Sequence, residues 1–369
     1  MKSFKPDNRI LMGPGPSNVH PKVLHALSRA PLGHLDPQFI ELMNEIKILV
    51  QYTFQTKSDA AFVLSGPGSL GMEACLVNLV EPGSKVIVCV GGYFANRMVQ
   101  IVEKIGGNAV VVKETWGRAI DPQKLEDTLK ENTDAKVVAF VHAETSTGAL
   151  SNIKELSAIA HKYNCMTIAD TVTSLGTTEV AFDDWGLDAS YSCSQKGLAC
   201  VAGMSPIAFS ERAQHFIKNR NNIRSWFNDL NLLMGYWSGG AKRAYHHTAP
   251  SNQFYGLHEA LLILQEEGLE NAWRRHKENS AKFIIKLNEL GLKPLVVNGE
   301  RIPNLISVIV PDGVDEAKVR TNLLKIHNLE IGAGLGELAG KIWRIGLMGY
   351  NSNEKMIDYC ISALKDVLI

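Results

Sequence analysis

The chain has 369 residues, of which 45% are hydrophobic and 21% charged, and its 38 basic side chains equal its 38 acidic ones. A chain without net charge creates no field that would favour nucleic acid or an anionic membrane, so a small-molecule partner is expected. The length exceeds the size at which one hydrophobic core stops growing, and we therefore expect a large domain and a smaller one.

The N-terminal residues 1–7 carry no continuous apolar segment behind their positive charges, and no run of 18 apolar residues occurs in the chain. We therefore expect a cytoplasmic protein. Its six cysteines form neither a CxxC pair nor a zinc spacing, so we expect buried, reduced thiols and no metal site.

Between about residues 60 and 210, short apolar runs alternate with longer segments of helical periodicity. This alternation is typical of the α/β class, in which a mostly parallel sheet is covered by helices and its strands are apolar throughout. The expected strands are Ala61–Leu64, Lys85–Val90, Ala109–Val112, Lys136–Val141, Met166–Ala169, Ala189–Ser192 and Pro206–Phe209. The expected helices between them are Ser69–Leu79, Ala95–Ile105, Pro122–Lys130 and Ile153–Tyr163.

The pattern changes after about residue 252. A long helical stretch to about Leu290 is followed by a strand over Leu305–Val310, a helix near Asp315–Ile326, a strand around Trp343–Ile345 and a closing helix. We expect a large domain over residues 15–255 and a small C-terminal α+β domain over residues 256–369, which also takes in residues 1–14.

Two polar residues stand at the ends of neighbouring apolar runs. Asp170 ends one run, and Lys196 follows the next run 26 positions later. Pyridoxal phosphate enzymes need such a pair, because a lysine holds the aldehyde of the cofactor and a carboxylate keeps its pyridine nitrogen protonated. Taken singly, Asp170 could cap the following turn and Lys196 could be a surface charge. The combination favours a transaminase.

The segment Ser65–Glu73, with the sequence SGPGSLGME, follows the first expected strand and opens a helix. Its free amides and the positive helix end predict a phosphate site. The segment is no Walker loop, because no Gly-Lys-Ser/Thr follows, and it does not match the dinucleotide fingerprint. Taken alone, a glycine turn without a ligand explains it equally well.

Together these motifs resemble the alanine:glyoxylate and serine:pyruvate aminotransferases, a family of class V aminotransferases with the fold type I pyridoxal phosphate architecture. The resemblance runs over nearly the whole chain, through Gly13–Asn18, Ser65–Glu73, Glu144–Gly148, Asp170, Ser194–Lys196, Tyr245–Thr248 and Trp343–Leu347. It implies a large domain with a mostly parallel seven-stranded sheet and a smaller C-terminal domain. It also implies transfer of an amino group from alanine or serine to glyoxylate or pyruvate.

The resemblance further implies a role for each site residue. Lys196 would form the Schiff base and move the proton between Cα and C4′, and Asp170 would pair with the pyridine nitrogen. The other implied cofactor-binding residues are Gly68, Ser69 and Gln195 at the phosphate, Thr145 near the ring hydroxyl, and Phe94 over the ring. Tyr245 and Thr248 would reach the phosphate of a neighbouring subunit, so a homodimer with shared sites is implied. Arg344 would bind the substrate carboxylate as a two-point fork, and Gly33 would also lie at the substrate.

Two positions depart from the family pattern. Phe94 stands where many members place tryptophan, so the stacking area is smaller and the N–H donor is missing. Ser69 stands where animal relatives carry histidine, which changes the cofactor pocket while leaving the phosphate contact possible.

Three other functions remain open. A ureidoglycine:glyoxylate aminotransferase is suggested by Leu32–Pro37 and by Asn252, although His34 stands where glutamine is expected. A pyridoxamine:pyruvate aminotransferase would use the same lysine. A catalytically silent subunit could retain the fold, but the intact Lys196, Asp170 and Arg344 argue against it. Alanine or serine is the preferred donor, because no second cation that would bind a dicarboxylate is evident near Arg344.

Overall fold

The computed structural model describes residues 1–220, 222–238 and 243–368. Its largest sheet has seven strands in the order β2-β10-β9-β8-β5-β3-β4. These are β2 (Ala61–Leu64), β3 (Lys85–Val90), β4 (Asn108–Lys113), β5 (Val137–Val141), β8 (Met166–Asp170), β9 (Ala189–Tyr191) and β10 (Ser205–Phe209). Only β10 runs antiparallel to its neighbours within this sheet. The predicted mostly parallel seven-stranded sheet is confirmed, with each strand within one residue of its expected bounds.

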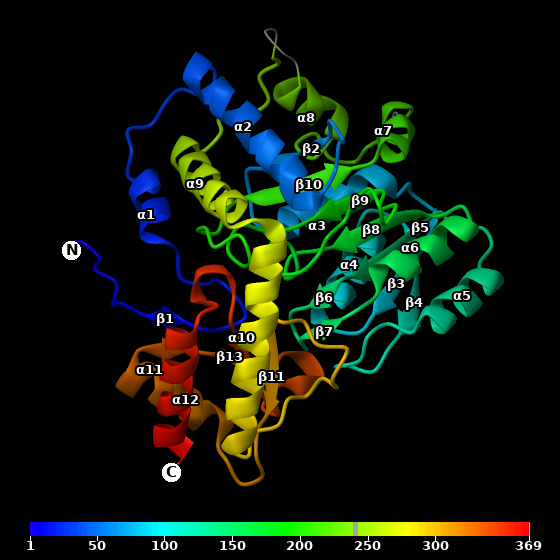
Figure 1. Cartoon of the computed structure of the whole chain (residues 1–369). Coiled ribbons are helices and arrows are strands. Elements are labelled where there is room, and N and C mark those ends of the chain that lie inside the picture. Colours follow the sequence, from blue (N-terminus) through cyan, green and yellow to red (C-terminus); the bar gives the residue numbers. More distant parts are fainter. Residues whose placement is uncertain (221, 239–242, 369) are drawn as a thin grey trace.

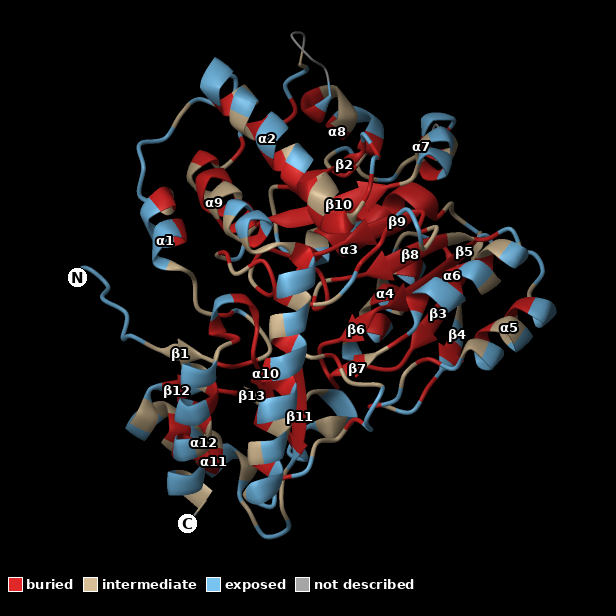
Figure 2. Ribbon diagram, viewed as in Figure 1, coloured by how far each residue is buried: buried red, intermediate tan, exposed pale blue. Residues whose placement is uncertain are grey.

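Helices cover both faces of this sheet (Figure 1). They include α3 (Gly68–Leu79), α4 (Tyr93–Lys104), α5 (Pro122–Glu131) and α6 (Ile153–Lys162), all four of which the sequence predicts. Every residue of the central strands β5, β9 and β10 is buried, whereas three of the six residues of the edge strand β4 are exposed. Figure 2 shows the same division, with buried strands between helices that are exposed on one side. The central strands are apolar along their whole length because both of their faces lie in the core.

The remaining elements of the large domain surround this core. They are α1 (Pro21–Leu27), α2 (Pro37–Phe54), α7 (Glu211–Lys218), α8 (Leu230–Trp237), α9 (Ser251–Glu267) and the short hairpin of β6 (Ala143–Glu144) and β7 (Ala149–Leu150).

The small domain is built around an antiparallel sheet with the order β11-β14-β13. Its elements are β11 (Leu305–Ile309), β13 (Gly332–Ala333), β14 (Ile342–Gly346), α10 (Leu269–Glu289), α11 (Glu316–His327) and α12 (Glu354–Leu368), with the 3-10 turns η2 (Gly336–Leu338) and η3 (Gly349–Asn351). Near the N-terminus, β1 (Ile10–Leu11) pairs in parallel with β12 (Leu329–Glu330). The N-terminal segment therefore joins the small domain.

The long helical stretch expected after residue 252 is two helices, not one. Gly268 separates α9 from α10 with φ +83°, a left-handed conformation that glycine adopts without steric cost. One buried apolar cluster extends along the chain to Ala272, and the cluster of the small domain takes up α10 again at Phe283. The domain boundary expected after residue 255 stays a prediction, and we propose from this packing that it lies within α10.

None of the described helices is both long and apolar enough to cross a membrane. All six cysteines are buried and free.

Candidate active site

A cavity of about 310 Å³ lies at the carboxyl ends of the parallel strands, where open α/β sheets bind ligands. Eight of the predicted site residues line it, namely Gly68, Ser69, Phe94, Thr145, Asp170, Gln195, Lys196 and Arg344. Asp170 is the last residue of β8, the other six come from loops and helix starts after strands, and Arg344 comes from β14 of the small domain. The fold therefore brings together residues that are up to 276 positions apart in the chain.

Lys196 is buried, with 6% of its surface exposed. Its Nζ donates to Thr145 Oγ1 at 2.7 Å and to Thr173 Oγ1 at 3.2 Å. Burial lowers the pKa of this amine to about 8, because the charged form loses its hydration. The N-terminal segment packs on its side chain at Gly15, where an added Cβ would lie 2.8 Å from Lys196 Cγ. Lys196 is therefore a desolvated amine at a cavity wall, which is the environment of a nucleophilic lysine.

Asp170, the last residue of β8, is also buried. Its Oδ2 accepts from the Tyr191 hydroxyl at 2.7 Å, and its Oδ1 accepts from the Val172 amide at 2.8 Å. Burial raises the pKa of this carboxyl to about 6, although both donors stabilise the charged form and lower it; Glu144 raises it further, whereas Lys196 lowers it. At neutral pH the carboxyl group of Asp170 is mostly ionised, and it can accept a further hydrogen bond from a donor in the cavity.

The start of α3 forms an anion site. The amides of Gly68 and Ser69 in its first turn donate to no group in the described part of the chain. Ser69 Oγ accepts from Arg97 Nη1 at 3.0 Å, and Gln195 holds a buried Oε1 that finds no partner among the described residues. Gly68 lies so close to Cys193 that a Cβ added at position 68 would be 3.1 Å from the Cβ of Cys193. Free backbone amides and a helix N-terminus suit a phosphate group, and the side chain of Gln195 could donate to it only through its amide nitrogen, because Oε1 is an acceptor.

Arg344 is fixed by two backbone contacts. Its Nε donates to the Ala333 carbonyl at 2.7 Å and its Nη1 to the Thr145 carbonyl at 3.0 Å. Nη2 makes no hydrogen bond within the described residues. Burial lowers the pKa of the guanidinium to about 10, against an opposing effect of Glu144, so the group stays charged at neutral pH. A buried cation with a free donor in a cavity is suited to a carboxylate.

Phe94 lines the cavity at the start of α4 between two cations. Lys196 Nζ lies 5.7 Å and Arg97 Cζ 5.0 Å from the centroid of its ring. The buried carboxylate of Glu144 caps this helix, because its oxygens accept from the amides of Phe94 at 3.3 Å and Ala95 at 3.2 Å. The position of the ring is thus set by a helix cap on a neighbouring loop.

Four residues of this site were missed by sequence reasoning. They are Arg97, Glu144, Thr173 and Tyr191, whose contacts are given above. Arg97 is a second cation in the lining of the cavity that contains Arg344, and it is hydrogen-bonded to Ser69 at the start of α3. Its position three residues after Phe94, on the same face of a helix, was a usable signal.

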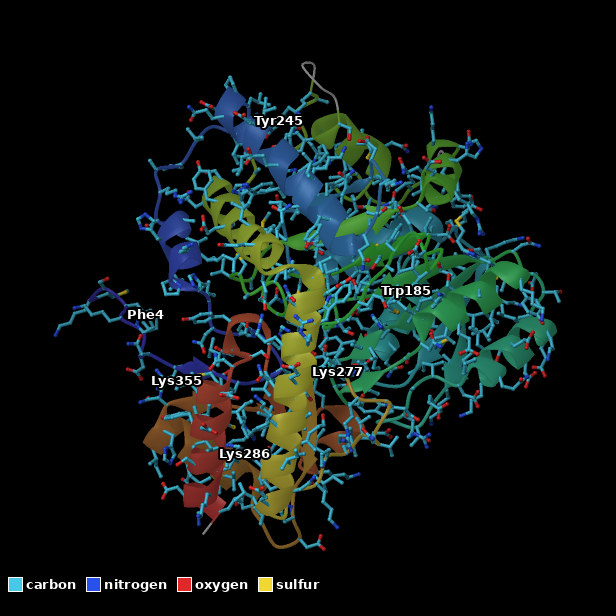
Figure 3. All side chains as sticks on the ribbon, viewed as in Figure 1. Phe4, Trp185, Tyr245, Lys277, Lys286 and Lys355 are labelled. Atoms are coloured by element: carbon cyan, nitrogen blue, oxygen red, sulfur yellow. The ribbon has the colours of Figure 1, made fainter. Side chains whose placement is uncertain are left out.

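Three predicted residues lie outside the cavity. Gly33, Tyr245 and Thr248 are exposed. The Tyr245 hydroxyl lies 3.4 Å from Thr248 Oγ1, and the ring of Tyr245 lies 5.1 Å from that of His34, the neighbour of Gly33. These residues therefore form one exposed region, and Figure 3 shows Tyr245 in the large domain near α2, away from the small domain.

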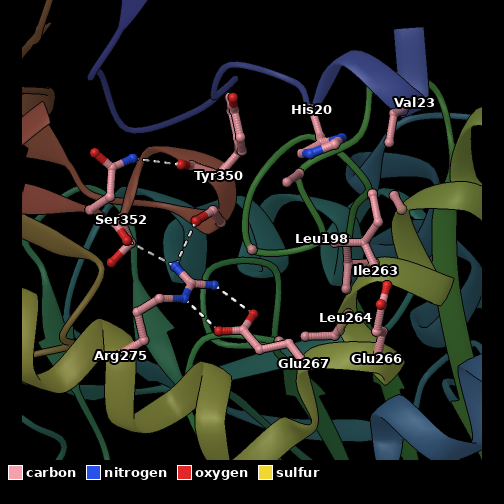
Figure 4. A pocket seen from close by; sticks show the side chains of 16 residues that line it. His20, Val23, Leu198, Ile263, Leu264, Glu266, Glu267, Arg275, Tyr350 and Ser352 are labelled. Carbon is pink, nitrogen blue, oxygen red and sulfur yellow. Dashed lines mark hydrogen bonds and ion pairs between the residues drawn. The ribbon is translucent and has the colours of Figure 1, made fainter. Parts of the chain in front are cut away.

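A second cavity, of about 490 Å³, lies between α9, α10 and the turn at Gly349. Figure 4 shows its largely apolar lining, with Leu198 and Ile263 on one side and the ion pair of Glu267 and Arg275 on the other. Neither Lys196 nor Asp170 lines it. The larger volume therefore does not make it the candidate site, because it lacks the nucleophile and the carboxylate. Among the described residues, no group of three or more His, Cys, Asp or Glu side chains could hold a metal ion.

Comparisons with known proteins identify the family of the chain. The family model "Aminotransferase class-V" matches residues 14–356. An alanine–glyoxylate aminotransferase of Drosophila melanogaster is 38% identical over 365 residues, which are 98% of this chain and 92% of the relative. A (S)-ureidoglycine–glyoxylate transaminase of Bacillus subtilis is 33% identical, over 98% of this chain and 91% of the relative.

Solved structures of aminotransferases are also similar to this chain. The crystal structure of an alanine–glyoxylate aminotransferase from Nostoc sp. superposes with a TM-score of 0.97 and 43% identity, covering 100% of this chain and 97% of that one. The ureidoglycine–glyoxylate aminotransferase from Bacillus subtilis reaches a TM-score of 0.96 at 34% identity, over 100% and 94% of the two chains. The predicted family resemblance and the fold type I architecture are confirmed. The chain belongs to the class V aminotransferases and is an enzyme that transfers amino groups.

Proposed function

We propose that this enzyme depends on pyridoxal phosphate and transfers the amino group of alanine or serine to glyoxylate or pyruvate. The observation that carries the proposal is the convergence of Lys196, Asp170 and Arg344 on one cavity of about 310 Å³. The relatives named as alanine–glyoxylate aminotransferases support the choice of substrates.

The residues present fit the cofactor. Gly68 and Ser69 would hold its phosphate through their free backbone amides, and Gln195, which lines the same cavity, would donate from its side-chain amide nitrogen. Asp170 would pair with the ring nitrogen, and Phe94 would stack on the ring. When bound, pyridoxal phosphate supplies an aldehyde that links amines covalently and a ring that accepts electrons from Cα.

The chain's own side chains supply the proton chemistry. With a pKa of about 8, Lys196 is unprotonated in about one tenth of molecules at pH 7, so it can take a proton from Cα of the amino acid. Its Nζ holds that proton between Thr145 and Thr173. Arg344 orients the amino acid through its carboxylate while Thr145 O fixes the guanidinium. The Lys196 and Arg344 contacts therefore place Cα next to the base.

The exposed region of Gly33, Tyr245 and Thr248 supports a homodimer with shared active sites. Each of these residues is expected at the cofactor or the substrate, yet none lines the cavity of its own subunit. The conflict is resolved if they serve the cavity of a second copy, in a twofold-symmetric pair. The cytoplasmic location stays a prediction.

Ureidoglycine is the second candidate donor, because the Bacillus subtilis relative bears that name. Asn252, which suggested this function, donates to the carbonyls of Leu27 at 2.9 Å and Arg29 at 2.6 Å. Its side chain thus fixes the segment that leads to Gly33. Asn252 therefore supports this segment, and it does not line the cavity of its own subunit.

Two measurements test the proposal. The purified protein should show a visible absorbance band of the lysine-linked cofactor, directly or after addition of pyridoxal phosphate; its absence in both cases would favour a silent subunit. A panel of alanine, serine, ureidoglycine and pyridoxamine against glyoxylate and pyruvate then identifies the substrates. Fast turnover of ureidoglycine or pyridoxamine alone would reject alanine and serine as donors.

A further inference from the structure

Two buried threonines hold the amine of Lys196. Thr145 follows the end of β5 and Thr173 follows the end of β8, and both hydroxyls accept from Nζ. The two hydroxyls also bond to each other. Thr173 is fully buried, and Thr145 is 5% exposed. The place of the amine is therefore set by two hydroxyl oxygens that belong to different loops of the large domain.

Two side chains of the small domain donate hydrogen bonds to the backbone carbonyls of these threonines. Arg344 Nη1 donates to the Thr145 carbonyl at 3.0 Å, and Asn304 Nδ2 donates to the Thr173 carbonyl at 2.6 Å. Arg344 lies on β14, and Asn304 directly precedes β11. A hydrogen bond to the carbonyl restrains the peptide plane that follows the threonine, so each contact restricts the backbone from which the hydroxyl projects.

Asn304 is held in place for this contact. It is fully buried, and its carbonyl accepts from the Leu347 amide at 2.9 Å, directly after β14. Its Oδ1 has no partner among the described residues. Burying an amide is unfavourable unless it is hydrogen-bonded, and the bond from Nδ2 to the Thr173 carbonyl offsets part of that cost.

The two residues that make these hydrogen bonds differ in whether they also line the cavity. Arg344 also faces the substrate cavity, whereas Asn304 is absent from the cavity lining. We propose that Asn304 is a positioning residue that sets the place of the Lys196 amine through Thr173, so that the position of the small domain controls the lysine. This inference rests on the proposed function of Lys196 as the residue that captures pyridoxal phosphate.

The test measures capture of pyridoxal phosphate by the apoenzyme, trapped at Lys196 by borohydride reduction, and in parallel the affinity for pyridoxamine phosphate. The second ligand has no aldehyde, so its binding reports on the pocket and not on the lysine. Asn304→Ala should slow capture by about tenfold, the usual effect of one hydrogen bond, with an unchanged affinity for pyridoxamine phosphate. Asn304→Leu, which keeps the volume but lacks the donor, is the second variant.

Thr173 provides the matched controls. Thr173→Val removes the hydroxyl and should slow capture by about tenfold, and Thr173→Ser should restore it. In the double variant, Asn304→Ala should add no further loss to Thr173→Val, because Asn304 acts only through that hydroxyl.

Three outcomes would overturn the inference. They are a wild-type rate of capture in foldable Asn304 variants, a wild-type rate in Thr173→Val, and multiplicative losses in the double variant. If the wild-type apoenzyme itself fails to capture pyridoxal phosphate at Lys196, the proposed function fails, and this inference fails with it.

Discussion

Lys196 places an ionisable amine in a largely buried position at the wall of the cavity. Its Nζ contacts two threonine hydroxyls, and no carboxylate lies within ion-pair distance among the described residues. An ordinary lysine keeps its charge in water, and here burial lowers the pKa to about 8. Burial of the Lys196 amine thus makes it easier to deprotonate at neutral pH and also lowers the stability of the folded protein.

Lys196→Met should stabilise the apoprotein at pH 7. The unfolded state binds a proton below pH 10.5 and the folded state only below about 8, so stability is lost as the pH falls through this window. The difference corresponds to about 3 kcal/mol at pH 7, and the melting temperature of the variant should exceed that of the wild type by a few degrees. At pH 10.5 the gain should largely vanish.

Lys277→Met is the matched control, because Lys277 is exposed on α10 (Figure 3). It should leave the melting temperature unchanged at both pH values. A lower melting temperature of Lys196→Met at pH 7 would contradict the assignment of Lys196 as a desolvated amine.

Tyr191→Phe should shift the acid limb of the pH profile of kcat/KM to higher pH. The Tyr191 hydroxyl donates to Asp170 and favours its ionised form, so its loss lets the pKa of Asp170 rise above about 6. A shift of up to about one pH unit is expected from one hydrogen bond. Tyr236→Phe removes a buried hydroxyl that has no partner among the described residues and should leave the limb in place. A limb that moves to lower pH would show that Asp170 does not control activity.

At the residue scale, sequence reasoning identified ionisable residues that line the cavity and missed residues that hydrogen-bond to them. Lys196 and Asp170 stand at strand ends, which local pattern locates. Thr173 and Tyr191 are recognisable only once β8 and β9 lie side by side in register, with Asp170 opposite Tyr191. That register comes from the packing of the whole sheet, and no local pattern contains it.

Helix α4 depends on a cap that comes from a distant loop. Gly92, before its first residue, has no side chain, and a Cβ there would lie 2.3 Å from Glu144 Cγ. This close approach lets the Glu144 carboxylate reach the free amides and the positive end of the helix. Sequence periodicity predicted α4, but it could not predict this cap, since Glu144 lies 50 positions beyond Phe94. The break at Gly268 was missed for a similar reason, because periodicity continues across a single glycine.

Glu144→Ala should weaken cofactor binding by releasing the start of α4. The lost cap should cost about 1–2 kcal/mol, seen as a lower melting temperature, and the affinity for pyridoxal phosphate should fall several-fold as Phe94 loosens. Asp121→Ala is the control, because Asp121 caps the remote α5 by accepting from the Gln123 amide at 2.9 Å. It should lower the melting temperature without changing the affinity. Equal affinities of Glu144→Ala and wild type would separate the cap from the cofactor site.

At the scale of the whole molecule, the large sheet presents its loops to a small domain that completes the cavity with Arg344. Composition and alternation of elements predicted both domains, whereas the division within α10 depends on which core each face meets. One predicted group remains outside this assembly, the exposed residues Gly33, Tyr245 and Thr248. In the proposed homodimer, these residues would contribute to the cavity of the second copy of the chain.

Mixing two defective variants should restore activity if Tyr245 and Thr248 serve the partner's cavity. One variant is Lys196→Ala, and the other carries Tyr245→Ala with Thr248→Ala. In a mixed dimer, the cavity of the second variant keeps its own Lys196 and receives Tyr245 and Thr248 from the first, so one cavity is complete. Random exchange makes half of the dimers mixed, and about one quarter of the wild-type activity is expected in this twofold-symmetric arrangement. If these residues acted within their own subunit, every cavity of the mixture would lack either the lysine or the tyrosine and threonine. Activity would then stay at the mean of the two separate variants, which the same titration of one variant with the other would measure.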